Sequence, residues 1–316
     1  MRIRPLAALS TVALATLLLA GCTGGSDSAS PTPDASGSLD LCAAAAPSGA
    51  ASDSVTVDGE VGEPATAEFA FPLEVTTPER TVLTEGDGDP IANGDLVNYA
   101  ATIYDASTGE QLTSIGYDPA ILPVPVTVAT GPDSYFGCAN LGSRIVMALP
   151  GAEGSPAVVW VLDALSTTPA AADGEEQEPV EGMPTVELAE DGAPTITLPD
   201  TDAPTELQLE VLKKGDGAEV ISGDTVLVHY TGMKLSDGSI FDSSWENGAP
   251  TQFPTTGVVP GFQQALEGQT VGSQMLVVIP PALGYGEGEI NDADLVGETL
   301  VFVVDILGTQ SATAGQ

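Results

Sequence analysis

Residues 225–241 read TVLVHYTGMKLSDGSIF, and this stretch decides the fold of the C-terminal part of the chain. Its first six residues are rich in β-branched side chains, which favour strands. The residues Ser236-Asp237-Gly238 have the composition of a turn and lead into another short apolar run. The stretch therefore predicts two antiparallel strands joined by a tight turn.

The neighbouring sequence extends this pattern into a sheet. Short apolar runs at residues 274–279 and 299–307 are bounded by Gly, Pro or Asp and are too short for typical helices. Only residues 260–267 have helical spacing, with Pro260 in the first turn, where proline is tolerated. A hairpin is expected at residues 186–198. The pattern predicts an α+β module, in which an antiparallel sheet curls over one short helix.

The chain also contains an internal repeat. Residues 82–88 (VLTEGDG) resemble residues 211–217 (VLKKGDG), 129 positions later, and further matches follow in the same order. Such a collinear series indicates a duplicated fold. We therefore expect two modules of the same α+β class.

Charge excludes several functions. Lys and Arg total 7 against 45 Asp and Glu, so the formal net charge is -38. We exclude nucleic acid as a partner, because phosphate contacts need clustered basic side chains. The same charge opposes attraction to anionic lipid headgroups.

The N-terminus has the form of an export signal. Arg2 and Arg4 precede an apolar run that ends at Gly21. Residues 19–22 (LAGC) resemble the bacterial lipobox, in which the cysteine is lipidated and becomes the mature N-terminus. We expect Cys22 to be a lipid anchor on the extracytoplasmic face of the cell membrane. The alternative is a buried helix with a stray cysteine.

Two cysteines remain, Cys42 and Cys138. In an oxidising compartment they suggest a disulfide that ties the N-terminal stretch to the first module, with two free buried thiols as the alternative. The sequence has one histidine, His229, and no CxxC spacing. We therefore expect no metal and no cofactor, and no nucleophilic catalysis of the Ser/His or Cys/His kind.

Four motifs in the second copy resemble FKBP-type peptidyl-prolyl isomerases, in family order. They are VHYTGM with DGSIFDSS (within residues 228–244), VVPGF (258–262), PALGYG (281–286) and LVFVVD (300–305). The resemblance covers residues 205–310. It implies two FKBP-like modules and an apolar pocket that accelerates X-Pro isomerisation without a nucleophile.

The resemblance also assigns roles to single residues. The catalytic positions are Tyr230, Asp242 and Tyr285: the Tyr285 O–H reaches a substrate carbonyl, and Asp242 polarises the site near the twisting amide. The substrate-binding positions are Phe241, Phe253, Val258, Val259, Phe262 and Phe302. Among them, Val259 N–H holds a carbonyl and Phe262 is the floor. Proline-containing peptides and unfolded secreted proteins would be partners, and macrolide FKBP ligands would fill the same pocket.

Two features depart from the family pattern in the second copy. Thr251 stands near the position of an aromatic wall residue, so one side of the pocket is expected to be open. Residues 281–296 resemble the segment that forms the flap over the pocket in this family, and the part at 287–296 is acidic, which disfavours acidic peptides. His229 alternates to the strand face opposite Tyr230, so we expect it to be structural.

The first copy departs further. At a spacing of 129, Ala101 stands for Tyr230, Leu112 for Phe241 and Thr113 for Asp242, and the flap has no counterpart. The sheet can survive these changes, whereas the pocket cannot.

Composition divides the chain into six parts. We expect a signal peptide at 1–21, a disordered tether at 22–54, a degenerate FKBP-like domain at 55–167, an acidic, solvated linker at 168–182, an isomerase domain with an N-terminal hairpin at 183–310 and a tail at 311–316. The leading hypothesis is an isomerase for secreted or cell-surface proteins. The alternative is a non-enzymatic surface lipoprotein that binds peptides or proteins.

Overall fold

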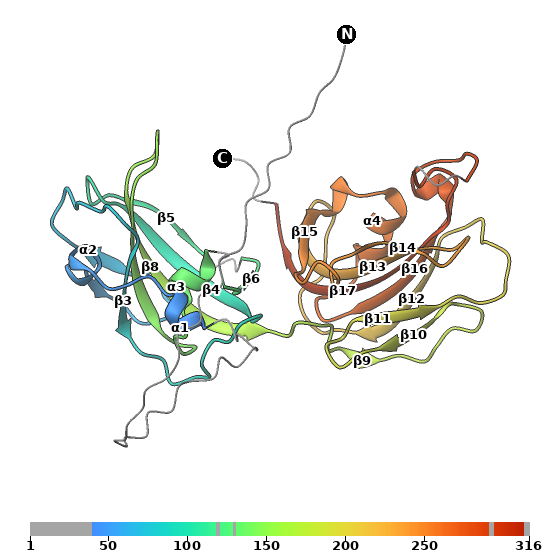
Figure 1. Cartoon of the computed structure of the whole chain (residues 1–316), viewed down its shortest axis with the longest axis horizontal. Coiled ribbons are helices and arrows are strands. Elements are labelled where there is room, and N and C mark those ends of the chain that lie inside the picture. Colours follow the sequence, from blue (N-terminus) through green and yellow to red (C-terminus); the bar gives the residue numbers. More distant parts are fainter. Residues whose placement is uncertain (1–39, 118–120, 129–130, 291–293, 313–316) are drawn as a thin grey trace, which may run out of the picture. The chain divides into compact units, whose positions relative to one another are not determined.

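Two larger antiparallel sheets carry the fold of the computed structural model, which describes residues 40–117, 121–128, 131–290 and 294–312. In Figure 1 the first sheet lies in the blue-to-green part of the chain and the second in the yellow-to-red part. A short helix accompanies each sheet, and two smaller hairpins precede them along the chain. The α+β class predicted from the sequence is therefore confirmed.

The second sheet has the long strand β17 near its centre. Its strands lie in the order β14 (Ile240–Ser243), β13 (Thr225–Lys234), β17 (Leu300–Gln310), β16 (Gln274–Ile279), β12 (Gln208–Lys214) and β9 (Glu175–Glu176), with β15 (Thr251–Pro254) also paired to β13. The turn predicted at residues 236–238 connects β13 to β14. Every pairing is antiparallel.

Both faces of this sheet are covered, which explains its nearly continuous apolar strands. Met275, Val277 and Ile279 of β16 belong to the core beneath the helix, whereas Leu276 and Val278 belong to a core on the opposite face. That opposite face packs against the predicted hairpin, formed by β10 (Thr185–Leu188) and β11 (Pro194–Thr197). Alternate side chains of a strand point to opposite faces, so each face needs its own apolar partner.

The helix α4 (Pro260–Leu266) forms where the sequence predicts it. Pro260 occupies the first turn, and Gly268 follows the helix with a φ of +82°, a left-handed value that favours glycine. A Cβ on Gly261 would stand 2.4 Å from Ile279 Cγ2, so this glycine permits the close approach of α4 to β16. Phe262 points into the core from the same helix.

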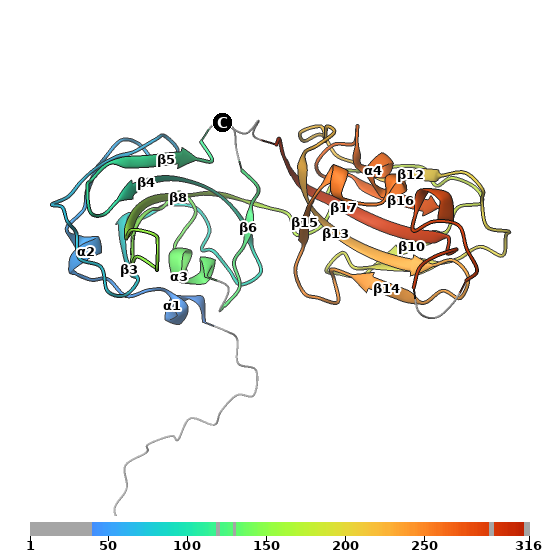
Figure 2. The same ribbon diagram turned by 90° about the horizontal axis from the view of Figure 1, so that it is seen from above.

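The first sheet repeats the strand order of the second. Its strands are β3 (Glu79–Thr84), β7 (Arg144–Leu149), β8 (Val158–Thr168), β4 (Leu96–Asp105) and β5 (Gln111–Ile115), with β6 (Val124–Pro125) paired to β4 and the helix α3 (Pro132–Phe136) nearby. Figure 2 shows this sheet and its helix from above. Even the register irregularities match, between Val82 and Thr84 and between Val211 and Lys213.

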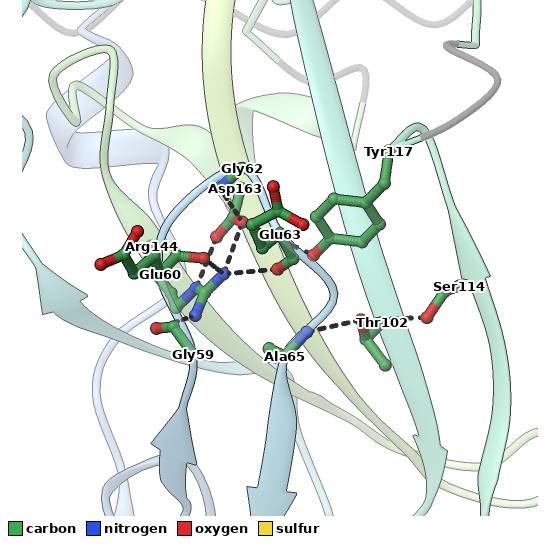
Figure 3. A network of polar contacts seen from close by, with 10 residues as sticks. All are labelled: Gly59, Glu60, Gly62, Glu63, Ala65, Thr102, Ser114, Tyr117, Arg144 and Asp163. Carbon is green, nitrogen blue, oxygen red and sulfur yellow. Dashed lines mark hydrogen bonds and ion pairs between the residues drawn. The ribbon is translucent and has the colours of Figure 1, made fainter.

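A buried ion pair fixes the N-terminal hairpin of the first module (Figure 3). Arg144 Nε lies 2.7 Å from Asp163 Oδ1, and both side chains are almost fully buried. The Arg144 guanidinium also donates to the carbonyls of Gly59 and Glu60, and Asp163 accepts the N–H of Gly62. The pair thus ties the loop between β1 (Thr56–Asp58) and β2 (Thr66–Glu68) to the central strands.

The prediction of a disordered tether is wrong for residues 40–54. This segment forms the short helices α1 (Leu41–Ala44) and α2 (Ala50–Asp53), and Leu41 and Ala51 are buried. The Glu79 carboxylate accepts the N–H groups of Ala51 and Ser52. These contacts hold an Ala/Ser-rich stretch whose composition alone suggests a linker.

Cys42 and Cys138 are joined by a disulfide across 96 residues. Of the two alternatives that the sequence leaves open, the structure has the bonded one. The bond connects α1 to the segment that follows α3, so residues near 42 are attached to the first module covalently as well as by packing.

The expectation of a solvated linker is wrong for part of residues 168–182. Strand β9 pairs with Lys213 and Lys214 at the edge of the second sheet. Ala172 is buried, its N–H donates to Asp305 Oδ2 over 2.8 Å, and its carbonyl accepts from Lys213 Nζ. The positive charges of the two lysines at the sheet edge complement the glutamates of β9, which favours this pairing.

The predicted signal peptide and Cys22 lie outside the described residues. Across the described ranges, no helix has the length and apolar character needed to cross a bilayer.

Candidate active site

A hollow opens on the helix-bearing side of the second sheet, with a volume of about 400 Å³. The structure brings together around it all nine residues that the sequence assigns to the pocket, and adds Gly257. The lining residues are Tyr230, Phe241, Asp242, Phe253, Gly257, Val258, Val259, Phe262, Tyr285 and Phe302.

Separate elements deliver these side chains to one place. Tyr230 comes from β13, Asp242 from β14 and Phe302 from β17. The 3-10 helix η1 (Thr255–Gly257) leads into Val258 and Val259, and a second 3-10 helix, η2 (Pro281–Leu283), precedes Tyr285. Because the residues are far apart in sequence, only the folded sheet assembles the hollow.

Aromatic rings form its base. Phe262 and Phe302 are 4% and 6% exposed, and their ring centroids lie 4.9 Å apart with an interplanar angle of 72°. Phe241 meets Phe302 edge-on at 5.5 Å, and Phe253 meets Phe262 at 5.8 Å. Edge-to-face contacts of this kind hold rings in fixed orientations, so the base is an apolar surface of defined shape.

Gly232 makes this ring arrangement possible, and sequence reasoning missed it. It pairs with Asp242 on one side and with Phe302 on the other. A Cβ at Gly232 would stand 2.7 Å from both Phe241 Cζ and Phe302 Cε1, closer than real contacts allow. A glycine inside a strand is the sequence signal for such a close approach.

One polar pair stands in the wall. Tyr230 Oη donates to Asp242 Oδ2 over 2.5 Å, and Asp242 is exposed to solvent. Burial raises the pKa of Tyr230 above its ordinary value, and the hydrogen bond to Asp242 raises it further. Tyr230 therefore stays protonated at neutral pH and remains a donor.

The buried hydroxyl of Ser244 forms hydrogen bonds with the backbone of Tyr230 and with the His229 ring. Ser244 Oγ accepts the N–H of Tyr230 at 2.8 Å and lies 2.8 Å from His229 Nδ1. The His229 ring stacks on Trp245, with centroids 3.9 Å apart. Burial lowers the pKa of His229 to about 4, so the ring is neutral at pH 7. His229 lies outside the hollow, which agrees with the structural role expected for it.

Two hydrogen-bond donors remain available at the rim. No described residue accepts a hydrogen bond from the Val259 N–H, whose own carbonyl accepts from Phe262 and Gln263 at the start of α4. Tyr285 is 52% exposed on the flap. Thr251 pairs with Val228 and does not line the hollow, so no aromatic ring stands at that point. Nowhere in the described parts of the chain do three His, Cys, Asp or Glu side chains form a group suited to a metal ion.

Comparisons with known proteins agree with this geometry. A family model described as "FKBP-type peptidyl-prolyl cis-trans isomerase" matches residues 217–307. The FK506-binding protein of Streptomyces anulatus is 37% identical over 105 residues, which cover 32% of this chain and 85% of that protein. The FKBP-type 22 kDa peptidyl-prolyl cis-trans isomerase of Escherichia coli is 46% identical over 101 residues, which cover 32% of this chain and 48% of that protein.

Among solved structures, FkpA from Escherichia coli is 30% identical, with a TM-score of 0.32, over 42% of this chain and 54% of that one. The chain belongs to the family of FKBP-type peptidyl-prolyl cis-trans isomerases. Its isomerase domain contains the aromatic hollow of the second module.

Proposed function

We propose that the aromatic hollow of the second module is the place where X-Pro bonds of secreted or cell-surface proteins are isomerised. The convergence of six separate elements on one apolar cavity with few polar groups supports this proposal most strongly. Its volume of about 400 Å³ falls in the range of small-molecule sites and has room for a prolyl residue.

The chemistry needs no covalent intermediate. Rotation about an X-Pro bond faces a barrier of about 18–20 kcal/mol, because the planar amide is stabilised by resonance. The twisted amide has lost that resonance and is less polar, so an apolar enclosure favours it over the planar form, which water solvates better. Binding the transition state better than the ground state is catalysis.

The polar groups have orienting roles in this proposal. The Val259 N–H and the Tyr285 O–H hold the carbonyls on either side of the proline, while Phe262 and Phe302 contact its ring. Asp242 accepts from Tyr230 and presents a negative field near the amide. In this proposal the apolar enclosure lowers the barrier and the polar groups fix the position of the chain, so no nucleophile is needed.

Proline-limited refolding of a reporter protein tests the proposal on the full mature chain. We expect acceleration, its inhibition by a macrolide that fills FKBP pockets, and its loss in the D242L and F262A variants. Circular dichroism of each variant separates loss of activity from loss of fold. Unchanged rates in folded variants would refute the assignment.

We also propose that Cys22 carries a lipid that holds the enzyme on the extracytoplasmic face of the membrane. The lipobox-like residues 19–22 and the polar residues after them support this. Mass spectrometry of the mature protein tests it: an N-terminal diacylglycerol on Cys22 is expected, and a chain that retains Met1 without lipid contradicts it.

The first module is, in our proposal, a degenerate FKBP-like domain without isomerase activity. Its sheet has the same strand order, but Ala101, Leu112 and Thr113 replace the residues that line the hollow. A role in binding client proteins is the second candidate function, favoured by the exposed side chains of Phe71 and Leu112. Client binding that survives loss of the second pocket would support it.

A further inference from the structure

A second cavity shares the flap with the aromatic hollow. It has a volume of about 570 Å³, and its walls come from residues 201–205, from the turn at 235–236 and from flap residues within 280–290 and 297–299. Tyr285 lines the aromatic hollow, whereas Glu287 lines the second cavity. Residues only two positions apart on the flap therefore line two different cavities.

All the charged residues that line this cavity are acidic. Asp202, Glu287 and Glu298 all contribute to its lining, and none of the lining residues is Lys, Arg or His. Three carboxylates without a cation create a negative potential in a concave site, where low-dielectric walls strengthen it. The cavity therefore attracts a cation.

Glu298 supplies the most specific observation. It is 1% exposed, and Ser236 Oγ donates to its Oε1 over 3.0 Å. Its Oε2 is buried and has no hydrogen-bond partner within the described part of the chain. An unpartnered buried carboxylate oxygen is costly, because it has lost water without gaining a donor. Because Oε2 is itself buried, the carboxyl group of Glu298 must turn towards the cavity that this residue lines before a donor that enters there can remove the cost.

The remaining walls suit a side chain with a long apolar stem. Leu235, Pro204, Pro281 and Ile290 offer apolar surface around the carboxylates. Arginine and lysine combine a methylene stem with a cationic head, and both bury the stem while the head seeks oxygen. A bound metal fits less well, because calcium needs several oxygens at about 2.3–2.6 Å around one point and the described residues contain no such group.

We propose that this cavity binds the arginine or lysine side chain of a client whose proline occupies the aromatic hollow. The inference rests on the proposed function of that hollow. An extended peptide advances about 3.3 Å per residue, so the four positions on either side of the proline sample about 13 Å of chain in each direction. The enzyme then prefers proline segments with a nearby positive charge.

A peptide series on the full mature chain tests the inference. Each peptide has one proline and carries arginine, norleucine or glutamate at one of the four positions on either side. We expect one arginine position to raise kcat/KM about tenfold over norleucine, mainly through KM, as one charge-assisted hydrogen bond predicts. Glutamate at that position lowers it.

Variants connect the preference to the cavity. In Glu298→Gln the ratio of kcat/KM between the arginine and norleucine peptides falls to about one, whereas the control Glu219→Gln removes an exposed carboxylate outside the cavity and keeps the wild-type ratio. If Glu298→Gln does not fold, the pair Asp202→Asn and Glu287→Gln must lower the ratio instead.

The outcomes separate the two claims. If the wild-type chain accelerates the arginine and norleucine peptides equally at every position, this inference is wrong and the proposed function stands. A preference that persists in the folded Glu298→Gln variant also overturns it. If no peptide is accelerated at all, the proposed function itself fails.

Discussion

The sheets of the two modules have the same strand order but carry different side chains in their cores. Strands β14-β13-β17-β16-β12 of the second follow the same order as β5-β4-β8-β7-β3 of the first. Where the second has Gly232, which leaves room for two phenylalanine rings, the first has Ile103 at the same strand position. Trp160 of the first module takes the position of Phe302 and contacts Tyr135. The same strand order therefore carries two different sets of core side chains.

A second contrast concerns the strand aspartates, Asp163 and Asp305. Each accepts an N–H from the segment that precedes the main sheet of its module, Gly62 in one case and Ala172 in the other. In the first module the partner of the aspartate is Arg144, and in the second it is Gln274. The hydrogen bond from the aspartate to the preceding segment is common to both modules, whereas the residues that line the aromatic hollow belong to the second.

The largest effect on stability is expected from removing the buried ion pair between Arg144 and Asp163. Asp163→Ala leaves the Arg144 guanidinium buried without its counter-ion, which costs about 3–5 kcal/mol of unfolding free energy. Urea denaturation monitored for the first module measures it, with the exposed Asp87→Ala as control. A loss below about 1 kcal/mol would mean that the ion pair does not hold the β1–β2 loop.

Transferring the first module's residues into the second gives the next largest effect. The triple variant Y230A/F241L/D242T should lose at least about a hundredfold in kcat/KM, or about 2.7 kcal/mol of transition-state stabilisation. The reciprocal variant A101Y/L112F/T113D should keep wild-type activity and gain none. Refolding kinetics measures both, and a fully active triple variant would contradict the account of the pocket.

The variant Gly232→Ala tests with a single methyl group whether the space left by this glycine is needed for the two phenylalanine rings. The added Cβ displaces the rings of Phe241 and Phe302, so we expect about 1–3 kcal/mol of destabilisation from overpacking and a roughly tenfold loss of activity. Ala replacement of Gly248, which has open space around it but a φ of +77°, adds backbone strain without a steric contact and so shows the size of a purely backbone effect. Normal activity in Gly232→Ala would show that the rings need not be held in place.

The smallest effect concerns pH and the only histidine in the chain. Burial lowers the pKa of His229 to about 4 in the folded protein, whereas the unfolded chain has an ordinary value near 6.5. The unfolded state binds the proton first, so this contribution to stability is lost as the pH falls from about 6.5 towards 4. Denaturation midpoints should fall less steeply over that range in His229→Gln than in the wild type; equal slopes would argue against a neutral buried ring.

Much of this architecture could be predicted from local sequence. Residues 260–267 have helical spacing and form α4, and the apolar runs become strands because strand propensity and burial agree there. Eight of the nine pocket residues, all except Phe253, lie in the four family motifs, which is why the sequence could name them. Contacts decided by distant residues escaped prediction. Residues 40–54 are held by Glu79 in addition to the disulfide that the sequence suggested, and residues 172–177 by Asp305 and Lys213.

Glu298 shows the same limit within the second cavity. Its neighbours in sequence give no sign of burial, because Ser236 and the segment 201–205 that surround it come from other parts of the chain. Gly232 could have been found, since a glycine inside a strand signals a close approach, but the sequence does not say what approaches it.

Exchange NMR on a short proline peptide in the presence of the full mature chain tests the central claim most directly. We predict faster exchange between the cis and trans resonances of the peptide, together with shifts in the aromatic signals of Tyr230, Phe262 and Phe302 and none in Trp160. Peptide binding that shifts those signals without accelerating the exchange would contradict the claim that the aromatic hollow favours the twisted amide.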